Sequence, residues 1–242
     1  MHKFADNLKV MSGIGFDTVK AVIITAMDKE RRQVEKVLEA LPQDSWKLRI
    51  LLRNCGIGKV NAAAAAQSVI DSIRPDFIIS AGVAGGLKDF LEQGDVVVGS
   101  RYAYHDVWCG EGNEYGQVQD MPAFFEGDAS LVAGALEMGG PHSRPAIHPG
   151  LICTGDKFSD DRDVLSNIRA HFPDALAVDM ESAAIAQVCH VNRVPFISFR
   201  IISNLSASEE SCLQYRRFWE SGVEERFSVL PAYLKYLENR IQ

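Results

Sequence analysis

The chain has 242 residues, of which 47% are hydrophobic and 24% are charged, and its formal net charge is -7 at pH 7. This composition is typical of a globular protein that buries a sizeable core, and the acidic balance argues against nucleic acid or a membrane surface as a partner. Segment 1–20 lacks the apolar run and cleavage site of a secretory signal. Five cysteines without close spacing indicate reduced thiols rather than a disulfide frame, so we expect a cytoplasmic protein.

Strand-like and helix-like segments alternate after a leader, residues 1–18, that we expect to be partly disordered. Apolar, β-branched runs predict strands at 19–26, 46–52, 77–81, 95–104, 151–153, 176–178 and 194–202. Helices are predicted from 28 to near 42 and at 60–73, 129–138 and 163–172, and the chain from 209 onward is mostly helical, with Pro231 as a kink or break. A long polar loop at 105–125 is of the kind that more often carries function. The order predicts one α/β domain over 19–242, with a mixed, largely parallel twisted sheet flanked by helices.

The segment Val178-Asp179-Met180-Glu181 stands between an extended apolar run and a helix of small residues. Its two carboxylates can be ordinary acidic residues that complement a helix dipole. They can also belong to a site if polar partners exist elsewhere, and candidates occur at 26–30, 80–87 and 200–204. Each follows an apolar strand-like run, which is where open α/β sheets build their sites.

Several common site types are not supported by the motifs. The glycine cluster Gly82, Gly85 and Gly86 does not have the GxGxxG spacing of a dinucleotide site, and a tight turn after a strand explains it equally well. Phosphate-binding P-loop, HExxH and GxSxG motifs are absent. His105-Asp106 is a lone pair without further metal ligands. We therefore expect neither a metal nor an organic cofactor.

A series of short segments, taken in order, resembles the nucleoside phosphorylase and nucleosidase superfamily, and within it the 5′-methylthioadenosine/S-adenosylhomocysteine nucleosidases. The matching segments are 26–30, 55–60, 81–87, 94–98, 104–106, 114–117, 154–158, 178–181 and 200–203. The resemblance covers the chain from about Val19 onward. It implies a nucleoside phosphorylase-like fold, a homodimer, a purine nucleoside as the small-molecule partner, and hydrolysis of an N-glycosidic bond with release of adenine.

The resemblance also implies a role for each matching residue. Glu30 is the expected general base that deprotonates water, Glu181 is expected to accept hydrogen bonds from the ribose hydroxyls, and Met180 to pack against the sugar. The other expected substrate contacts are Phe158 stacking on the base, the main chain of Ser159 reading its edge, Ile57 lining a slot for the 5′-alkylthio group, Gly85 allowing close backbone approach, and Ala84, Asp179 and Ser203.

The turn after the first strand separates hydrolysis from phosphorolysis. The phosphorylases of the superfamily that this chain resembles hold phosphate at this turn with glycines and an arginine. In this chain, Asp28 and Glu30 would repel a phosphate dianion. Arg31 and Arg32 follow, and we interpret them as solvated cations on the helix face. Hydrolysis is therefore favoured.

Asn204 departs from the family pattern, which has Asp there as a general acid for N7 of the departing adenine. An amide donates a hydrogen bond but no proton, and positioned proton transfer is worth about 10²–10⁴-fold in rate. Three explanations stay open: an engineered substitution that slows turnover, a natural residue of enzymes that release a 6-oxopurine, as futalosine hydrolases do, or a weakly active paralogue that binds nucleosides. Adenine nucleosides are the first expectation, because the 104–117 region resembles the methylthioadenosine-type enzymes.

Overall fold

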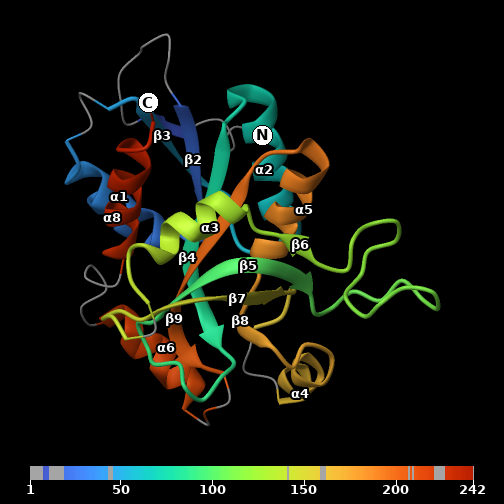
Figure 1. The fold of residues 1–242 in the computed structure, drawn as a ribbon. Helices are drawn as coiled ribbons and strands as arrows, with labels where there is room; N and C mark the ends of the chain where they lie inside the picture. Colours follow the sequence, from blue (N-terminus) through green and yellow to red (C-terminus); the bar gives the residue numbers. More distant parts are fainter. Residues whose placement is uncertain are drawn as a thin grey trace.

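The computed structural model describes residues 8–10, 19–42, 46–140, 142–158, 162–206, 208, 210–220 and 227–241. Helices flank both faces of a twisted mixed sheet (Figure 1), which confirms the predicted α/β fold. The strands are β1 (Leu8–Val10), β2 (Val19–Thr25), β3 (Leu48–Asn54), β4 (Phe77–Gly86), β5 (Val96–Tyr104), β6 (Phe125–Glu126), β7 (Ile147–Thr154), β8 (Ala175–Asp179) and β9 (Phe196–Leu205). The helices are α1 (Asp28–Glu39), α2 (Lys59–Ile73), α3 (Ala129–Leu136), α4 (Arg162–His171), α5 (Ser182–Asn192), α6 (Ser211–Glu220) and α8 (Val229–Glu238).

The pairing of the strands brings distant parts of the chain together. Parallel pairs are β2–β3, β2–β4, β4–β9, β5–β7 and β7–β8. Antiparallel pairs are β1–β3, β4–β8, β5–β6 and β5–β9. The pairs among β4, β8, β7, β5 and β9 close a ring at one end of the sheet. That ring places β4, β8 and β9, which carry three of the predicted polar segments, beside one another.

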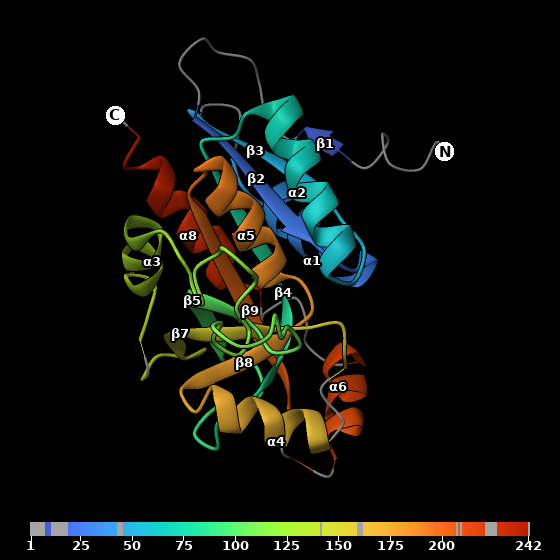
Figure 2. The same ribbon diagram turned by 90° about the vertical axis from the view of Figure 1, so that its right-hand side faces the viewer.

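Alternate side chains of β2 pack into two different cores. Ala21 and Ile23 lie in the core that includes residues of α1, α3 and α8, whereas Val22 and Ile24 lie in the core that includes residues of α2 and α5. Figure 2 shows α2 and α5 side by side on their face of the sheet. Because successive strand residues point to opposite faces, a strand covered on both sides must be apolar at every position. This accounts for the continuous apolar run in the sequence.

β4 and β9 both extend beyond their predicted ends, into segments that form the site. β4 continues through the glycine cluster to Gly86, so the cluster lies in a strand and not in a tight turn. β9 continues to Leu205, so 200–204 lies inside a strand rather than after it. The glycines of β4 allow close approach: a Cβ on Gly82 would lie 2.5 Å from Glu30 Oε1, and one on Gly86 would lie 3.1 Å from Ile202 Cγ2. Glycine thus lets the strand pass where a side chain would collide.

Smaller differences from the sequence prediction follow from short or terminal elements. β3 begins at Leu48, and the two-residue strand β6 was not predicted. β1 lies within the expected leader and pairs with β3, while the rest of that leader falls outside the described residues. Pro231 neither kinks nor breaks a helix, because it lies in the first turn of α8, where a backbone N–H has no helical acceptor.

Candidate active site

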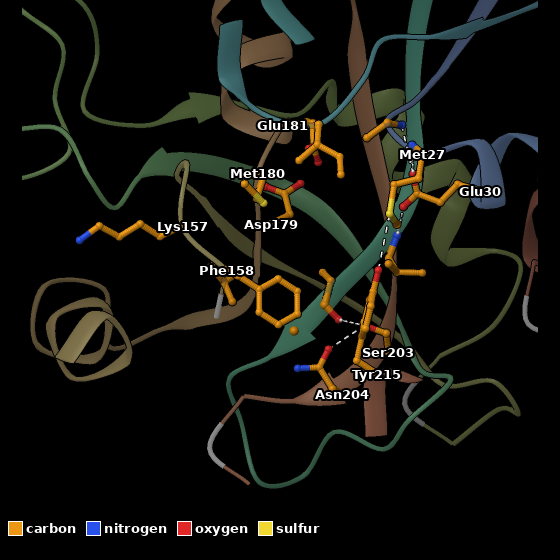
Figure 3. Close-up of a pocket in the computed structure, with 16 residues that line it drawn as sticks. Met27, Glu30, Lys157, Phe158, Asp179, Met180, Glu181, Ser203, Asn204 and Tyr215 are labelled. Carbon is orange, nitrogen blue, oxygen red and sulfur yellow. Dashed lines mark hydrogen bonds between the residues drawn. The ribbon is translucent and has the colours of Figure 1, made fainter. Parts of the chain in front are cut away.

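A cavity opens where β2, β4, β8 and β9 meet the start of α1 and the inner side of α6 (Figure 3). Its empty volume is about 680 Å³, part of it open to solvent, which is in the range of small-molecule sites. Its walls combine apolar side chains with buried carboxylates. The lining residues are Ala26, Met27, Glu30, Ile57, Val83, Ala84, Gly85, Lys157, Phe158, Val178, Asp179, Met180, Glu181, Ser203, Asn204 and Tyr215.

Glu30 lies in the first turn of α1 with its carboxylate buried at the cavity wall. Its Oε2 accepts hydrogen bonds from the backbone N–H groups of Ala26 (3.1 Å) and Met27 (2.9 Å), and its Oε1 accepts from Val83 N–H (2.9 Å). The bond from Met27 closes the start of the helix, while the bond from Val83 ties α1 to β4. Burial raises the pKa of Glu30, and the charge of Arg200 opposes that rise. The carboxylate is thus held in one position and poised to bind a proton.

Arg200 on β9 is a buried cation among acidic groups. Its Nε donates to Asp179 Oδ2 (2.7 Å), and its Nη2 donates to Ser80 Oγ (3.0 Å) and lies 3.8 Å from Glu181 Oε2. The Asp179 carboxylate also accepts hydrogen bonds from Thr154 Oγ1 and from Ser182 N–H. Asp179 therefore lines the cavity, but its oxygens face interior partners, and holding Arg200 explains its position better than contact with a substrate.

Glu181 is the second carboxylate directed at the cavity. It stands at the start of α5 but makes no capping bond to that helix. Instead, its Oε1 accepts a hydrogen bond from Gly58 N–H (3.0 Å), at the N-terminus of α2. Burial and the charge of Asp179 raise the pKa of Glu181 to about 8, against the influence of Arg200. An acidic residue that complements the start of a helix therefore describes Asp179, which accepts a hydrogen bond from Ser182 N–H. It does not describe Glu181, whose side chain makes no capping bond to the start of α5.

The opposite end of the cavity is formed by aromatic and amide side chains. The Phe158 ring is 44% exposed and lies edge-on to Tyr215, with ring centroids 5.5 Å apart. Asn204, which is buried, accepts a hydrogen bond at Oδ1 from Ser203 Oγ (2.7 Å) and donates one from Nδ2 to Ser211 Oγ (2.7 Å). In Figure 3 the Phe158 ring and the Asn204 amide both lie on the side of the cavity away from Glu181.

The charges of the site favour a particular kind of ligand. Glu30, Asp179 and Glu181 surround one guanidinium, so the cavity has an excess of negative charge when the carboxylates are ionised. Such a site stabilises positive charge that develops on a bound molecule, and carboxylate oxygens accept hydrogen bonds from hydroxyl groups.

Nearly all of the predicted site residues come together. Ser159 lies outside the described residues; the others line this cavity: Glu30, Ile57, Ala84, Gly85, Phe158, Asp179, Met180, Glu181, Ser203 and Asn204. Sequence reasoning gave no role to Arg200 or Tyr215. Arg200 stood in a recognised segment, so its buried charge could have been noticed. Nothing in the local sequence of Tyr215 indicates that α6 turns it toward Met27 at the start of α1.

Neither a metal cluster nor a membrane span is found in the part of the chain that the structure describes. No three His, Cys, Asp or Glu side chains of that part are arranged to hold an ion. No helix of that part combines the length and apolar character that crossing a bilayer requires.

Comparison with known proteins gives consistent relatives. The family model described as the phosphorylase superfamily matches residues 20–235. A 5′-methylthioadenosine/S-adenosylhomocysteine nucleosidase from Exiguobacterium sp. is 40% identical over 192 residues, which cover 79% of this chain and 82% of the relative. One of the same name from Geobacillus thermodenitrificans is 34% identical over 234 residues, covering 92% and 99%.

Solved structures that resemble this chain include nucleosidases of the same name. The nucleosidase of the same name from Neisseria meningitidis, in complex with methylthio-immucillin-A, has a TM-score of 0.81 and 33% identity, covering 89% of this chain and 98% of that chain. The nucleosidase from Colwellia psychrerythraea, in complex with adenine, has a TM-score of 0.82 and 32% identity, covering 93% and 98%.

The fold and the cavity at the ends of β2, β4 and β8 thus define a member of the phosphorylase superfamily. Relatives more than 30% identical extend along most of the chain and share one name. Within the superfamily, the chain belongs to the 5′-methylthioadenosine/S-adenosylhomocysteine nucleosidases.

Proposed function

We propose that the chain hydrolyses the N-glycosidic bond of 5′-methylthioadenosine and S-adenosylhomocysteine and releases adenine. The observation that carries this proposal is Glu30, a buried carboxylate held by three backbone N–H groups at the wall of a cavity that Glu181 also lines. The relatives are named for these two substrates, and one solved relative binds adenine.

The sugar is expected to lie between the two carboxylates. Glu30 orients a water molecule and takes its proton as the water attacks the anomeric carbon. Glu181 accepts hydrogen bonds from the ribose hydroxyls, which fixes that carbon in place, and Met180 packs against the ring. In their ionised forms, both carboxylates favour the oxocarbenium character that the sugar acquires in the transition state.

The base and the 5′ substituent occupy the remaining walls. Phe158 stacks on the purine, and its exposed ring supports this assignment. Asn204 donates a hydrogen bond to N7, and Ile57 contributes to the slot for the 5′-alkylthio group. Contacts from Ala84, Gly85 and Ser203, and from the main chain of Ser159, complete the proposed set.

The disposition of cations supports hydrolysis over phosphorolysis. Arg31 pairs with Glu35 through Nη1 and Oε1 at 2.8 Å, so its charge is used on the surface of α1. Arg200 is paired with Asp179 in the interior. A phosphate dianion in this cavity would therefore meet the carboxyl groups of Glu30 and Glu181. Among the described residues that line the cavity, Lys157 is the only cation, and it is exposed.

The released base tests the proposal directly. The protein is incubated with 5′-methylthioadenosine, S-adenosylhomocysteine and futalosine, and free bases are separated by chromatography with and without inorganic phosphate. We expect adenine from the first two substrates at a rate that does not depend on phosphate. Hypoxanthine from futalosine with no adenine from the others would overturn the proposal.

A second function is favoured by one observation, the amide at position 204. An amide can pair with both N7 and O6 of a 6-oxopurine if both of its hydrogens are available, so a futalosine-type nucleoside hydrolase is the alternative. A weakly active nucleoside-binding protein is a further one, since Asn204 cannot donate a proton. Tight substrate binding by calorimetry with no base released over hours would favour the binding protein.

We further propose a homodimer in the cytoplasm with a part in methionine salvage. Apolar side chains on the outer face of α2 and α5 support the dimer: Val60 is 78% exposed and Val191 is 59% exposed. Trp108, on the long loop, is also exposed and could complete a neighbour's pocket. Gel filtration that returns a monomer at micromolar concentration would contradict the dimer.

A further inference from the structure

The hydrogen bonds around Asn204 limit what its amide can offer to a ligand. Asn204 and Ser211 are 2% and 4% exposed, so few water molecules can compete for their polar atoms. Nδ2 of Asn204 donates to Ser211 Oγ at 2.7 Å, and Oδ1 accepts from Ser203 Oγ at 2.7 Å. A carboxamide has two N–H donors and two acceptor lone pairs. One donor and one lone pair therefore remain for the cavity.

The position of Ser211 is fixed by contacts between α6 and the end of β9. Gln214 Oε1 accepts a hydrogen bond from Leu205 N–H (2.8 Å). Gln93 Nε2 donates to the carbonyl oxygens of Ser203 (2.7 Å) and Gln214 (3.1 Å), which joins the strand to the helix. Ser211 N–H itself bonds the Ser208 carbonyl (3.1 Å). These hydrogen bonds thus fix the position of Ser211, whose hydroxyl accepts the hydrogen bond from Asn204 Nδ2.

The remaining donor and acceptor match one class of purine. Adenine presents an acceptor at N7 and a donor at its 6-amino group, and an asparagine amide pairs with both at once. A 6-oxopurine presents acceptors at both N7 and O6 and would need two N–H groups. With one N–H given to Ser211, O6 would face the amide oxygen, and a site built for a donor rejects the analogue that lacks it.

We propose that Ser211 is a specificity-determining residue, which selects a 6-aminopurine leaving group by occupying one N–H of Asn204. This inference rests on the proposed function, because it requires the base to lie against Asn204. It separates the two alternatives that the amide leaves open: Asn204 alone is compatible with either purine, whereas Asn204 bonded to Ser211 is complementary to adenine.

The test compares Ser211→Ala with two matched variants. Ser208→Ala removes a hydroxyl from the segment that joins β9 to α6. Ser203→Ala removes the other hydroxyl that forms a hydrogen bond with Asn204. For each protein, kcat/KM is measured for adenine release from 5′-methylthioadenosine and for hypoxanthine release from its 6-oxo analogue. Binding of adenine and of hypoxanthine is measured separately by calorimetry, because base binding does not require turnover.

We expect the wild-type protein to prefer the 6-amino compounds. Ser211→Ala should shift the ratio of kcat/KM, and the ratio of binding constants, toward the 6-oxo compound by about 3- to 10-fold, the factor that one net hydrogen bond is worth. Ser208→Ala should leave both ratios unchanged. An unchanged ratio in Ser211→Ala, or an equal shift in Ser203→Ala or Ser208→Ala, would overturn the proposal. If no nucleoside is cleaved but the calorimetric ratio shifts as expected, the proposed function fails and the assignment of Ser211 stands.

Discussion

Replacing Glu30 by Gln keeps the shape of the side chain and removes its capacity to take a proton. The carboxylate accepts three backbone hydrogen bonds, two at Oε2 and one at Oε1. A carboxamide can keep the two bonds from Ala26 and Met27 at its oxygen, but its NH₂ group then faces Val83 N–H. One bond is lost and two donors are opposed, which should cost about 1–3 kcal/mol of folding stability.

The expected loss of activity is larger than this loss of stability. Positioned general-base catalysis is worth about 10²–10⁴-fold, or about 3–5 kcal/mol of activation free energy. Glu30→Gln should therefore reduce kcat for adenine release by at least about 100-fold. Because Glu181 and Phe158 are unchanged, substrate binding measured by calorimetry should change much less than kcat.

Chromatographic assay of adenine, together with thermal denaturation of each variant, separates the two effects. Glu35→Gln is the matched control, since it makes the same change on the same helix at a carboxylate that pairs with Arg31 on the helix surface. A folded Glu30→Gln protein that retains more than about a tenth of wild-type kcat, far above the range expected for a lost base, would refute the assignment of the base.

Three further predictions concern the remaining charged and amide groups. The raised pKa of Glu181, about 8 against 4.5 for the ordinary group, means that the folded state binds a proton more tightly. The free energy of unfolding should therefore fall as the pH rises through that window, by at most about 1.4 kcal/mol per pH unit. Glu181→Gln should flatten the fall in urea titrations, and an unchanged slope would contradict the assignment. Arg200→Met should lower stability by about 3–5 kcal/mol, because it leaves Asp179 without its buried partner; a change of melting temperature too small to measure would count against this. Asn204→Asp should increase adenine release, by up to about 10²–10⁴-fold, and no change in rate would remove the role proposed for this position.

Several features of the protein could be read from local sequence, because each depends on nearby residues. The apolar runs of β2, β4 and β9 predicted strands buried on both faces, since a strand covered by helices on each side admits no polar alternation. The acidic residues after β2 and β8 predicted a site at the strand ends. The order of the short matching segments along the chain indicated a resemblance to the family, which the relatives confirm.

Other features depend on contacts between distant segments and on strand register, and only the tertiary structure decided them. The glycines of β4 are compatible with a turn in the sequence, yet they lie in a strand, and Glu30 and Ile202 from distant segments approach them closely. Glu181 looks like a helix-start acid, yet its hydrogen-bond donor is Gly58, at the N-terminus of α2. Ser211 lies seven residues after Asn204, and only the return of α6 against β9 brings its hydroxyl to the amide. Sequence therefore determined which chemical groups the protein has, and the packing of α2 and α6 against the sheet decided what each group can bond.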